Sequence, residues 1–99
     1  MVVVIARVKV QPGKEDEFAA AGKKMIAHVK AHEPGTITYT LNQSTADKTD
    51  FVFYEVYQDP GAFAAHAGSD MMKEFGRSLG SVVAGRPEIT MYDEVDAKR

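Results

Sequence analysis

The residues of this sequence best suited to proton transfer or metal binding are its three histidines and one glutamate in an apolar segment. His28 and His32 lie four positions apart, so on a helix both would project from one face, as pairs of metal ligands do. His66 closes the segment "DPGAFAAH". Glu55 interrupts the segment "FVFYEVYQ", where an unpaired buried carboxylate would be costly. Each of these residues has a functional and a structural interpretation.

A helix terminus explains His28 and His32 better than a metal centre does. A metal site would need a third ligand, and the chain contains no cysteine to supply one. Cationic side chains near the C-terminal end of a helix, by contrast, interact favourably with its dipole. Pro34 and Gly35 follow at once and would end the helix there. We therefore expect no metal site in this chain.

His66 is the stronger candidate for catalysis, because an imidazole titrates near neutral pH and can take a proton from a phenol. Its structural alternative is a hydrogen bond that ties a helix end to a neighbouring strand. Glu55 could serve as a base or a proton relay. The favoured alternative for Glu55 is an ion pair in a dimer interface, for example with Arg7. At the level of the sequence both interpretations of each residue stay open.

Several other side chains could complete a site for a flat aromatic molecule. The candidate hydroxyl donors are Tyr39, Tyr54, Tyr57 and Tyr92. The alternative for each is a core residue whose ring is buried and whose hydroxyl contacts solvent. Asn42 could position an oxygen anion. The adaptable apolar wall of a pocket, or simply a core, would consist of Phe63, Met71, Met72, Phe75 and Met91.

The hydrophobic pattern predicts that four strands and two helical regions hold these residues. Alternation and β-branched side chains predict strands at 2–10, 36–43, 51–58 and 87–95. An apolar stripe of period 3.6 predicts a helix over 14–32. A second helical region starts at Asp59-Pro60, breaks near Gly68 and resumes after Ser69. Gly76 and Gly80 inside it indicate that another backbone or a ligand lies close by.

The order β-α-β-β-α-β is that of the α+β ferredoxin-like fold, an antiparallel sheet with both helical regions on one face. A single domain would cover residues 1–95, with a C-terminal tail at 96–99. The helices leave the second face of the sheet uncovered, yet the strand at 51–58 is apolar on both faces. We therefore expect a homodimer in which the bare sheet faces of two copies pack together.

Composition and charge exclude several classes of function. The net charge is -2 and the twelve Lys and Arg residues are scattered, so neither nucleic acid nor a membrane is expected as a partner. Without cysteine there is no disulfide, thiolate metal site or iron–sulfur cluster, which suits a reducing cytoplasm. No segment reaches membrane-spanning length. The absence of G-x-G-x-x-G, P-loop and G-x-S-x-G motifs disfavours bound nicotinamide and nucleophilic hydrolysis.

Four segments together resemble the antibiotic biosynthesis monooxygenase domain family. They are "HEPGTITYTL", "FVFYEVYQDPGAFAAH", Phe75 and "RPEITMYDE". The most specific blocks are Glu33-Pro-Gly35-x-x-x-Tyr39 and Glu55-Val-Tyr57 with Asp59, Ala62 and His66 in register. The resemblance covers nearly the whole chain and implies a dimeric α+β barrel, with His66 bordering a pocket between helices and sheet. Within the family, the chain is most similar to the small quinol monooxygenases, a group that also holds isomerases and members without an established substrate. Because the chain lacks tryptophan, haem breakdown, the activity of another branch, is a minor alternative.

The residues and the resemblance predict a monooxygenase that uses no metal, flavin or other cofactor and oxidises a small phenolic or quinol substrate with dioxygen. A phenolate can reduce dioxygen itself once it is deprotonated and shielded from water. The predicted catalytic residues are His66, Tyr54 and Glu55. The predicted substrate-binding residues are Tyr39, Asn42, Phe63, Met71, Phe75 and Met91. The alternatives are a small-molecule binding or stress-response dimer without catalysis, and an isomerase of a small carbonyl compound.

Overall fold

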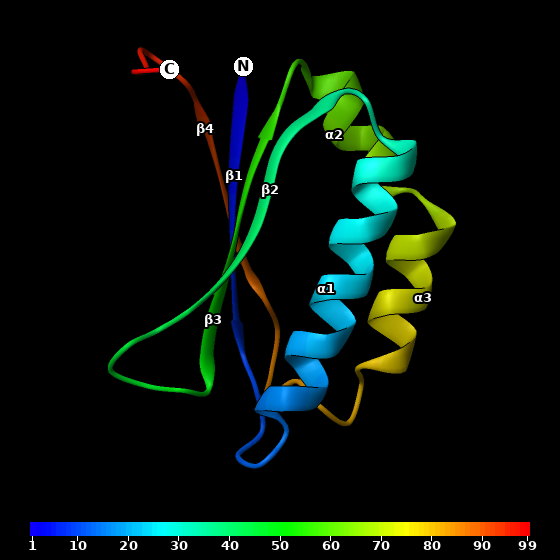
Figure 1. Cartoon of the computed structure of the whole chain (residues 1–99), viewed down its shortest axis with the longest axis vertical. Coiled ribbons are helices and arrows are strands. Elements are labelled where there is room, and N and C mark those ends of the chain that lie inside the picture. Colours follow the sequence, from blue (N-terminus) through cyan, green and yellow to red (C-terminus); the bar gives the residue numbers. More distant parts are fainter.

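The chain folds into two layers, an antiparallel sheet and a set of helices that covers one face of it (Figure 1). The computed structural model describes residues 1–99. Its elements are β1 (Val2–Lys9), α1 (Glu15–His32), β2 (Thr36–Gln43), β3 (Asp50–Tyr57), α2 (Pro60–Ala67), α3 (Asp70–Ser78) and β4 (Glu88–Asp93). The strand order β2-β3-β1-β4, with every neighbouring pair antiparallel, is the ferredoxin-like order. The predicted α+β ferredoxin-like fold is therefore confirmed, with the break in the second helical region separating α2 from α3.

Short capping signals fix where the two later helices begin. Asp59 caps α2, because its Oδ1 accepts a hydrogen bond from the Ala62 N–H at 2.8 Å, and Pro60 takes the first helical position. Ser69 caps α3 in the same way and accepts a hydrogen bond from the Met72 N–H at 3.1 Å. None of the helices combines the length and the apolar run that a membrane crossing requires.

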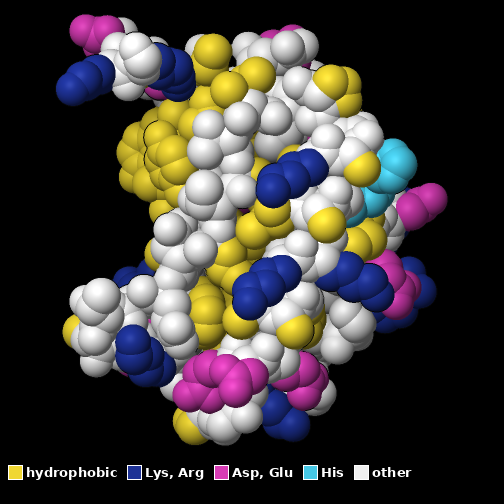
Figure 2. All heavy atoms as spheres, viewed as in Figure 1, with side chains coloured by type: hydrophobic (Ala, Val, Ile, Leu, Met, Phe, Trp, Pro, Cys, Tyr) yellow, Lys and Arg dark blue, Asp and Glu magenta, His cyan; other side chains and the backbone are white.

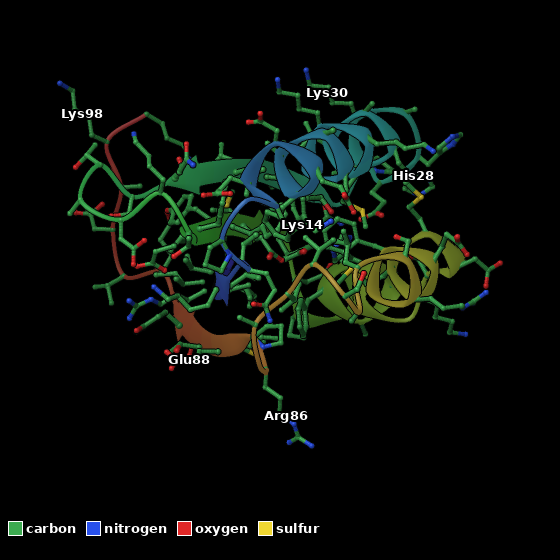
Figure 3. The ribbon with its side chains drawn as sticks, turned by 90° about the horizontal axis from the view of Figure 1, so that it is seen from below. Lys14, His28, Lys30, Arg86, Glu88 and Lys98 are labelled. Atoms are coloured by element: carbon green, nitrogen blue, oxygen red, sulfur yellow. The ribbon has the colours of Figure 1, made fainter.

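Side chains of β1 and β3 alternate between a face that meets the helices and a face that does not. The helix side holds Phe51, Phe53, Glu55 and Tyr57 of β3, paired with Val8, Ala6, Val4 and Val2 of β1. Phe18 of α1 reaches into this layer, where its ring centroid lies 4.9 Å from that of Phe51. Seen from below, side chains fill the space between sheet and helices (Figure 3). The core therefore lies in one layer, and Glu55 is a carboxylate within it.

The second face of the sheet carries no helix (Figure 1). Its exposed apolar residues gather near the start of β1, where Tyr54 is 39% and Tyr92 51% exposed. A group of hydrophobic side chains is visible there, at the upper left of Figure 2. The other end of this face carries two ion pairs, Arg7 with Asp50 and Lys9 with Asp47. The apolar character predicted for the second face is thus concentrated at one end of the sheet.

Candidate active site

A cavity of about 480 Å³ lies between the sheet and the helices. Thirteen of its nineteen lining residues are hydrophobic, and Phe63, Met72 and Phe75 supply part of its helical wall. A volume of this size suits a small organic ligand. The cavity reaches the edge of the sheet at β4, where the lining residue Ile89 is 60% exposed. Only three lining side chains end in polar groups, namely Tyr39, Glu55 and His66.

His66 is held at the cavity by one hydrogen bond to its backbone and one to its ring. The side chain is 3% exposed, and the Ser69 hydroxyl donates a hydrogen bond to the His66 carbonyl oxygen at 2.8 Å. The ring Nδ1 lies 2.8 Å from Glu33 Oε1. Because a carboxylate accepts, we assign the proton to Nδ1, which leaves Nε2 as an acceptor. Nε2 has no partner in the protein and is not a fully buried atom, so it opens on the cavity that His66 lines.

Glu33 reaches His66 because the turn after α1 packs closely against α2. Glu33 caps α1 with its backbone N–H, which donates to the Val29 carbonyl oxygen at 3.0 Å. A Cβ at Gly35 would lie 2.8 Å from the Ala62 Cβ, so only glycine leaves room for α2 at this distance. A carboxylate at the C-terminal end of a helix is opposed by the helix dipole, and the bond to His66 offsets that cost.

Glu55 faces the same cavity from β3. Its Oε1 accepts a hydrogen bond from the Tyr57 hydroxyl at 2.6 Å, and its other oxygen is neither bonded within the protein nor fully buried. Burial raises the pKa of Glu55 to about 7, while the Tyr57 hydrogen bond lowers it and the negative charge of Glu33 raises it. Glu55 is therefore poised to exchange a proton near neutral pH.

The predicted ion pair between Glu55 and Arg7 is wrong. Arg7 instead donates to Asp50, with Nη2 to Oδ2 at 2.8 Å and Nε to Oδ1 at 3.0 Å. The reason is the alternation of β1 and β3, which sends Arg7 to the bare face and Glu55 to the helix face. Glu55 is thus excluded from an interface on the bare face.

Tyr39 completes the polar side of the cavity. Its ring centroid lies 5.0 Å from that of His66, and it pairs across the strands with Glu55. Burial raises the pKa of Tyr39 well above its usual value, and the charges of Glu55 and Glu33 raise it further. The Tyr39 hydroxyl consequently stays protonated at neutral pH and can donate to an oxygen of a ligand.

The structure brings together five of the predicted site residues at the cavity: His66, Glu55, Tyr39, Phe63 and Phe75. The other four lie outside its lining. Tyr54 follows the opposite face of β3. The Asn42 side chain donates to the Val52 carbonyl oxygen at 3.1 Å. Of the two neighbouring candidates for the apolar wall, Met72 lines the cavity and Met71 does not. On β4 the lining residue is Ile89 and not Met91.

Gly76 and Gly80 were expected inside a helix, close to another backbone or a ligand. The structure has no other backbone close to Gly76, and Gly80 lies beyond the end of α3. A Cβ at Gly76 would meet no atom within 4 Å, and one at Gly80 would meet only the Arg77 carbonyl oxygen at 4.0 Å. Both glycines instead line the cavity, which they widen by lacking side chains. Glu33 is the site residue that sequence reasoning missed. The available signal was an acidic residue at the end of a helix that its dipole disfavours.

His28 and His32 stack at the end of α1, with their ring centroids 4.9 Å apart. His28 Nε2 lies 3.8 Å from Glu33 Oε2. No three His, Cys, Asp or Glu side chains are arranged so that they could hold a metal ion.

Comparison with known proteins places these residues in a family context. Residues 1–78 match the family described as "Antibiotic biosynthesis monooxygenase". A crystal structure from Caulobacter crescentus, described as a putative antibiotic biosynthesis monooxygenase, superposes with a TM-score of 0.91 at 36% identity, over 96% of this chain and 90% of that one. The Bacillus subtilis protein named "Putative monooxygenase YcnE" is 32% identical over 67% of this chain and 68% of its own length. An uncharacterized Synechocystis protein is 30% identical over 92% of this chain, which spans 61% of that relative's length.

Proposed function

Because the chain belongs to the antibiotic biosynthesis monooxygenase family, we propose that it oxidises a small phenolic or quinol substrate with dioxygen in the cavity between sheet and helices. The proposed reaction uses no metal or organic cofactor. The observation that carries the proposal is the pairing of His66 Nδ1 with Glu33, which leaves Nε2 free to act as a base in a largely apolar cavity.

The chemistry begins with transfer of the substrate hydroxyl proton to His66 Nε2. The phenolate then gives one electron to dioxygen, and the two radicals join as a new C–O bond on the ring. The peroxide takes up a proton, the ring carbon loses its hydrogen as a proton, and the O–O bond breaks to leave a carbonyl. The departing hydroxide combines with that proton, so a phenol and dioxygen give a quinone and water, and the substrate supplies all the electrons.

The other polar side chains of the cavity have complementary tasks in this reaction. The Tyr39 hydroxyl donates to the substrate oxygen, where negative charge develops as the proton leaves. Glu55 accepts the second proton, because its pKa near 7 lets it take up and release protons at neutral pH. Apolar residues such as Phe63 and Phe75 contact the flat ring and exclude water, which strengthens each of these interactions.

We further propose that the protein acts as a cytoplasmic homodimer formed through the bare face of the sheet. Tyr54 and Tyr92 are exposed on that face, and no element of the chain covers them. Apolar contact of this kind contributes about 25 cal/mol per Å² buried. A second copy of the chain would offer the same residues in a self-complementary arrangement.

The test is an assay of the purified protein with a panel of naphthols and hydroquinones, with and without oxygen. Turnover that requires oxygen and forms quinone supports the proposal. Turnover of small carbonyl compounds without oxygen would assign an isomerase to the same acid–base residues, and binding without any turnover would assign a ligand-binding dimer. Denatured protein and the His66→Ala variant serve as controls for spontaneous oxidation of the substrates.

A further inference from the structure

Glu33 orients His66 through Oε1, and this role does not explain why its second carboxylate oxygen, Oε2, is buried. Oε2 is buried and has no hydrogen-bond partner, the one side-chain atom of the protein in that condition. Leaving a buried acceptor unpaired is unfavourable, because the acceptor loses its hydrogen bonds to water on burial. An imidazole nitrogen, which donates or accepts according to the ring tautomer, stands close by, because His28 Nε2 lies 3.8 Å from Oε2. A small rotation of the His28 ring would bring the two atoms within hydrogen-bond distance.

His28 in turn connects this oxygen with solvent. Its side chain is 29% exposed and lines a second pocket, of about 420 Å³, which lies outside the apolar cavity. Only two of the eleven residues around this pocket are hydrophobic, so it is a place for water. Figure 3 labels His28 at the end of α1 on the side toward the other helices, and Figure 2 shows histidine at the surface there.

We propose that Glu33 and His28 form a proton relay that joins His66 in the cavity to the polar pocket at the surface. This inference rests on the proposed function, since the relay carries the proton that the substrate hydroxyl gives up in that reaction. As Nε2 of His66 takes the substrate proton, the proton on Nδ1 passes to Glu33 Oε1. Rotation of the carboxyl group presents that proton to His28, whose ring exchanges it with water. Only N–H and O–H bonds form and break, and no electrons change partners.

The relay has a defined task, although the overall reaction releases no net proton. It removes the proton while the substrate anion reduces dioxygen and returns it when the peroxide must be protonated. Glu33 interacts with groups on three other elements, α2, β2 and β3. The Thr36 hydroxyl donates to Oε1 at 3.2 Å, and the negative charge of Glu33 acts on Glu55 and Tyr57 across the cavity wall.

The experiment compares His28→Gln with His32→Gln, a matched control one turn further along α1 that lines the same pocket. The first measurement needs no substrate: NMR of ¹⁵N-labelled protein follows the exchange of the His66 Nδ1 proton with water. We expect this exchange to slow by about tenfold in His28→Gln and to stay at the wild-type rate in His32→Gln. The second measurement is oxygen-dependent turnover, where kcat should fall about tenfold in His28→Gln at unchanged KM, with partial rescue by added imidazole.

Each outcome decides between the alternatives. Equal exchange rates in His28→Gln and wild-type protein would overturn the relay, whatever the activity. Equal slowing in both variants would also overturn it, because the effect would then belong to the helix end as a whole. Exchange could also be slow in His28→Gln alone while the wild-type protein turns over none of the phenols. That result would support the proton relay and contradict the proposed oxygenation. Amide spectra that match the wild type establish that both variants are folded.

Discussion

Glu33 Oε1 and His66 Nδ1 lie 2.8 Å apart, although 33 residues separate the two side chains in the chain. The contact joins the end of α1 to α2 and fixes which His66 nitrogen faces the cavity. A carboxylate that holds an imidazole in this way orients it and stabilises its protonated form. The orientation of a base at the cavity therefore depends on a residue outside the cavity lining.

Replacing Glu33 by Gln should lower kcat by about tenfold to a hundredfold with a smaller effect on KM, because the amide keeps the shape of the side chain but no longer offers His66 Nδ1 a charged acceptor. Steady-state assays of the oxygen-dependent reaction measure this. Thr36→Val is the control, since it removes the other donor to the same oxygen and leaves the His66 contact in place. If Glu33→Gln kept full kcat, the orienting role of the carboxylate would have to be abandoned.

His66→Ala should reduce kcat/KM by about a hundredfold to ten-thousandfold, the contribution typical of a positioned general base. It should also destabilise the fold by about 1–3 kcal/mol, because the Glu33 carboxylate loses its His66 partner and keeps only the Thr36 hydroxyl. Urea unfolding measures the second effect, and adding Glu33→Ala to the variant should recover part of it. Unchanged turnover in a folded His66→Ala protein would remove this histidine from the reaction.

Glu55→Gln should change how stability depends on pH. Burial raises the Glu55 pKa from 4.5 to about 7, so the folded state binds this proton more tightly than the unfolded chain does. The stability contributed by that proton is fully present below about pH 4.5 and is lost as the pH rises to about 7, a total of about 3 kcal/mol. Relative to wild type, Glu55→Gln should therefore gain stability between pH 5 and pH 8.

Urea unfolding of both proteins at pH 5 and pH 8 gives the required difference. Glu17→Gln is a suitable control, because Glu17 is an exposed carboxylate on α1. The same wild-type slope in Glu55→Gln would show that the buried carboxylate does not titrate in this window.

Gly76 offers a way to narrow the cavity without disturbing the core. A Cβ at this position of α3 meets no atom within 4 Å, so Gly76→Ala should stabilise the protein by about 0.5–1 kcal/mol through helix propensity alone. Gly76→Leu adds a longer side chain to the cavity lining and should raise KM for two-ring substrates more than for hydroquinone. Thermal unfolding and steady-state kinetics test the two parts. Equal KM changes for small and large substrates would place the substrate elsewhere.

The sequence predicted most of the secondary structure because its local signals agree. Asp59 and Pro60 begin α2 where predicted, and the alternation over residues 36–43 coincides with β2. The Glu33–His66 contact is different, because it depends on how closely two helices pack, which Gly35 permits but no local pattern reveals. The secondary structure could thus be predicted from the sequence, while the Glu33–His66 contact could not.

The geometry of strands and helices separates residues that were predicted to share one site. Tyr54 and Glu55 are neighbours on one strand, so they point to opposite faces and could not both line one cavity. Met71 and Met72 differ by one position on α3, and only the packed helix shows which of them turns toward the sheet. The phase of a helix is set by the side chains packed against it, and an apolar stripe about 100° wide does not distinguish between two neighbouring positions.

The uncovered face of the sheet should determine how the protein assembles. Tyr54 of β3 and Tyr92 of β4 both lie on the face of the sheet that no helix covers, near one end of it. The ion pair of Lys9 with Asp47 lies at the other end of this face. We expect the wild-type protein to sediment as a dimer at micromolar concentration and Tyr54→Arg/Tyr92→Arg to sediment as a folded monomer, because two copies would then bring like charges together. Lys9→Gln, at the polar end, should leave the dimer intact. A wild-type protein that remains a folded monomer throughout would rule out this interface, and the cavity reaction would then have to proceed within a single chain.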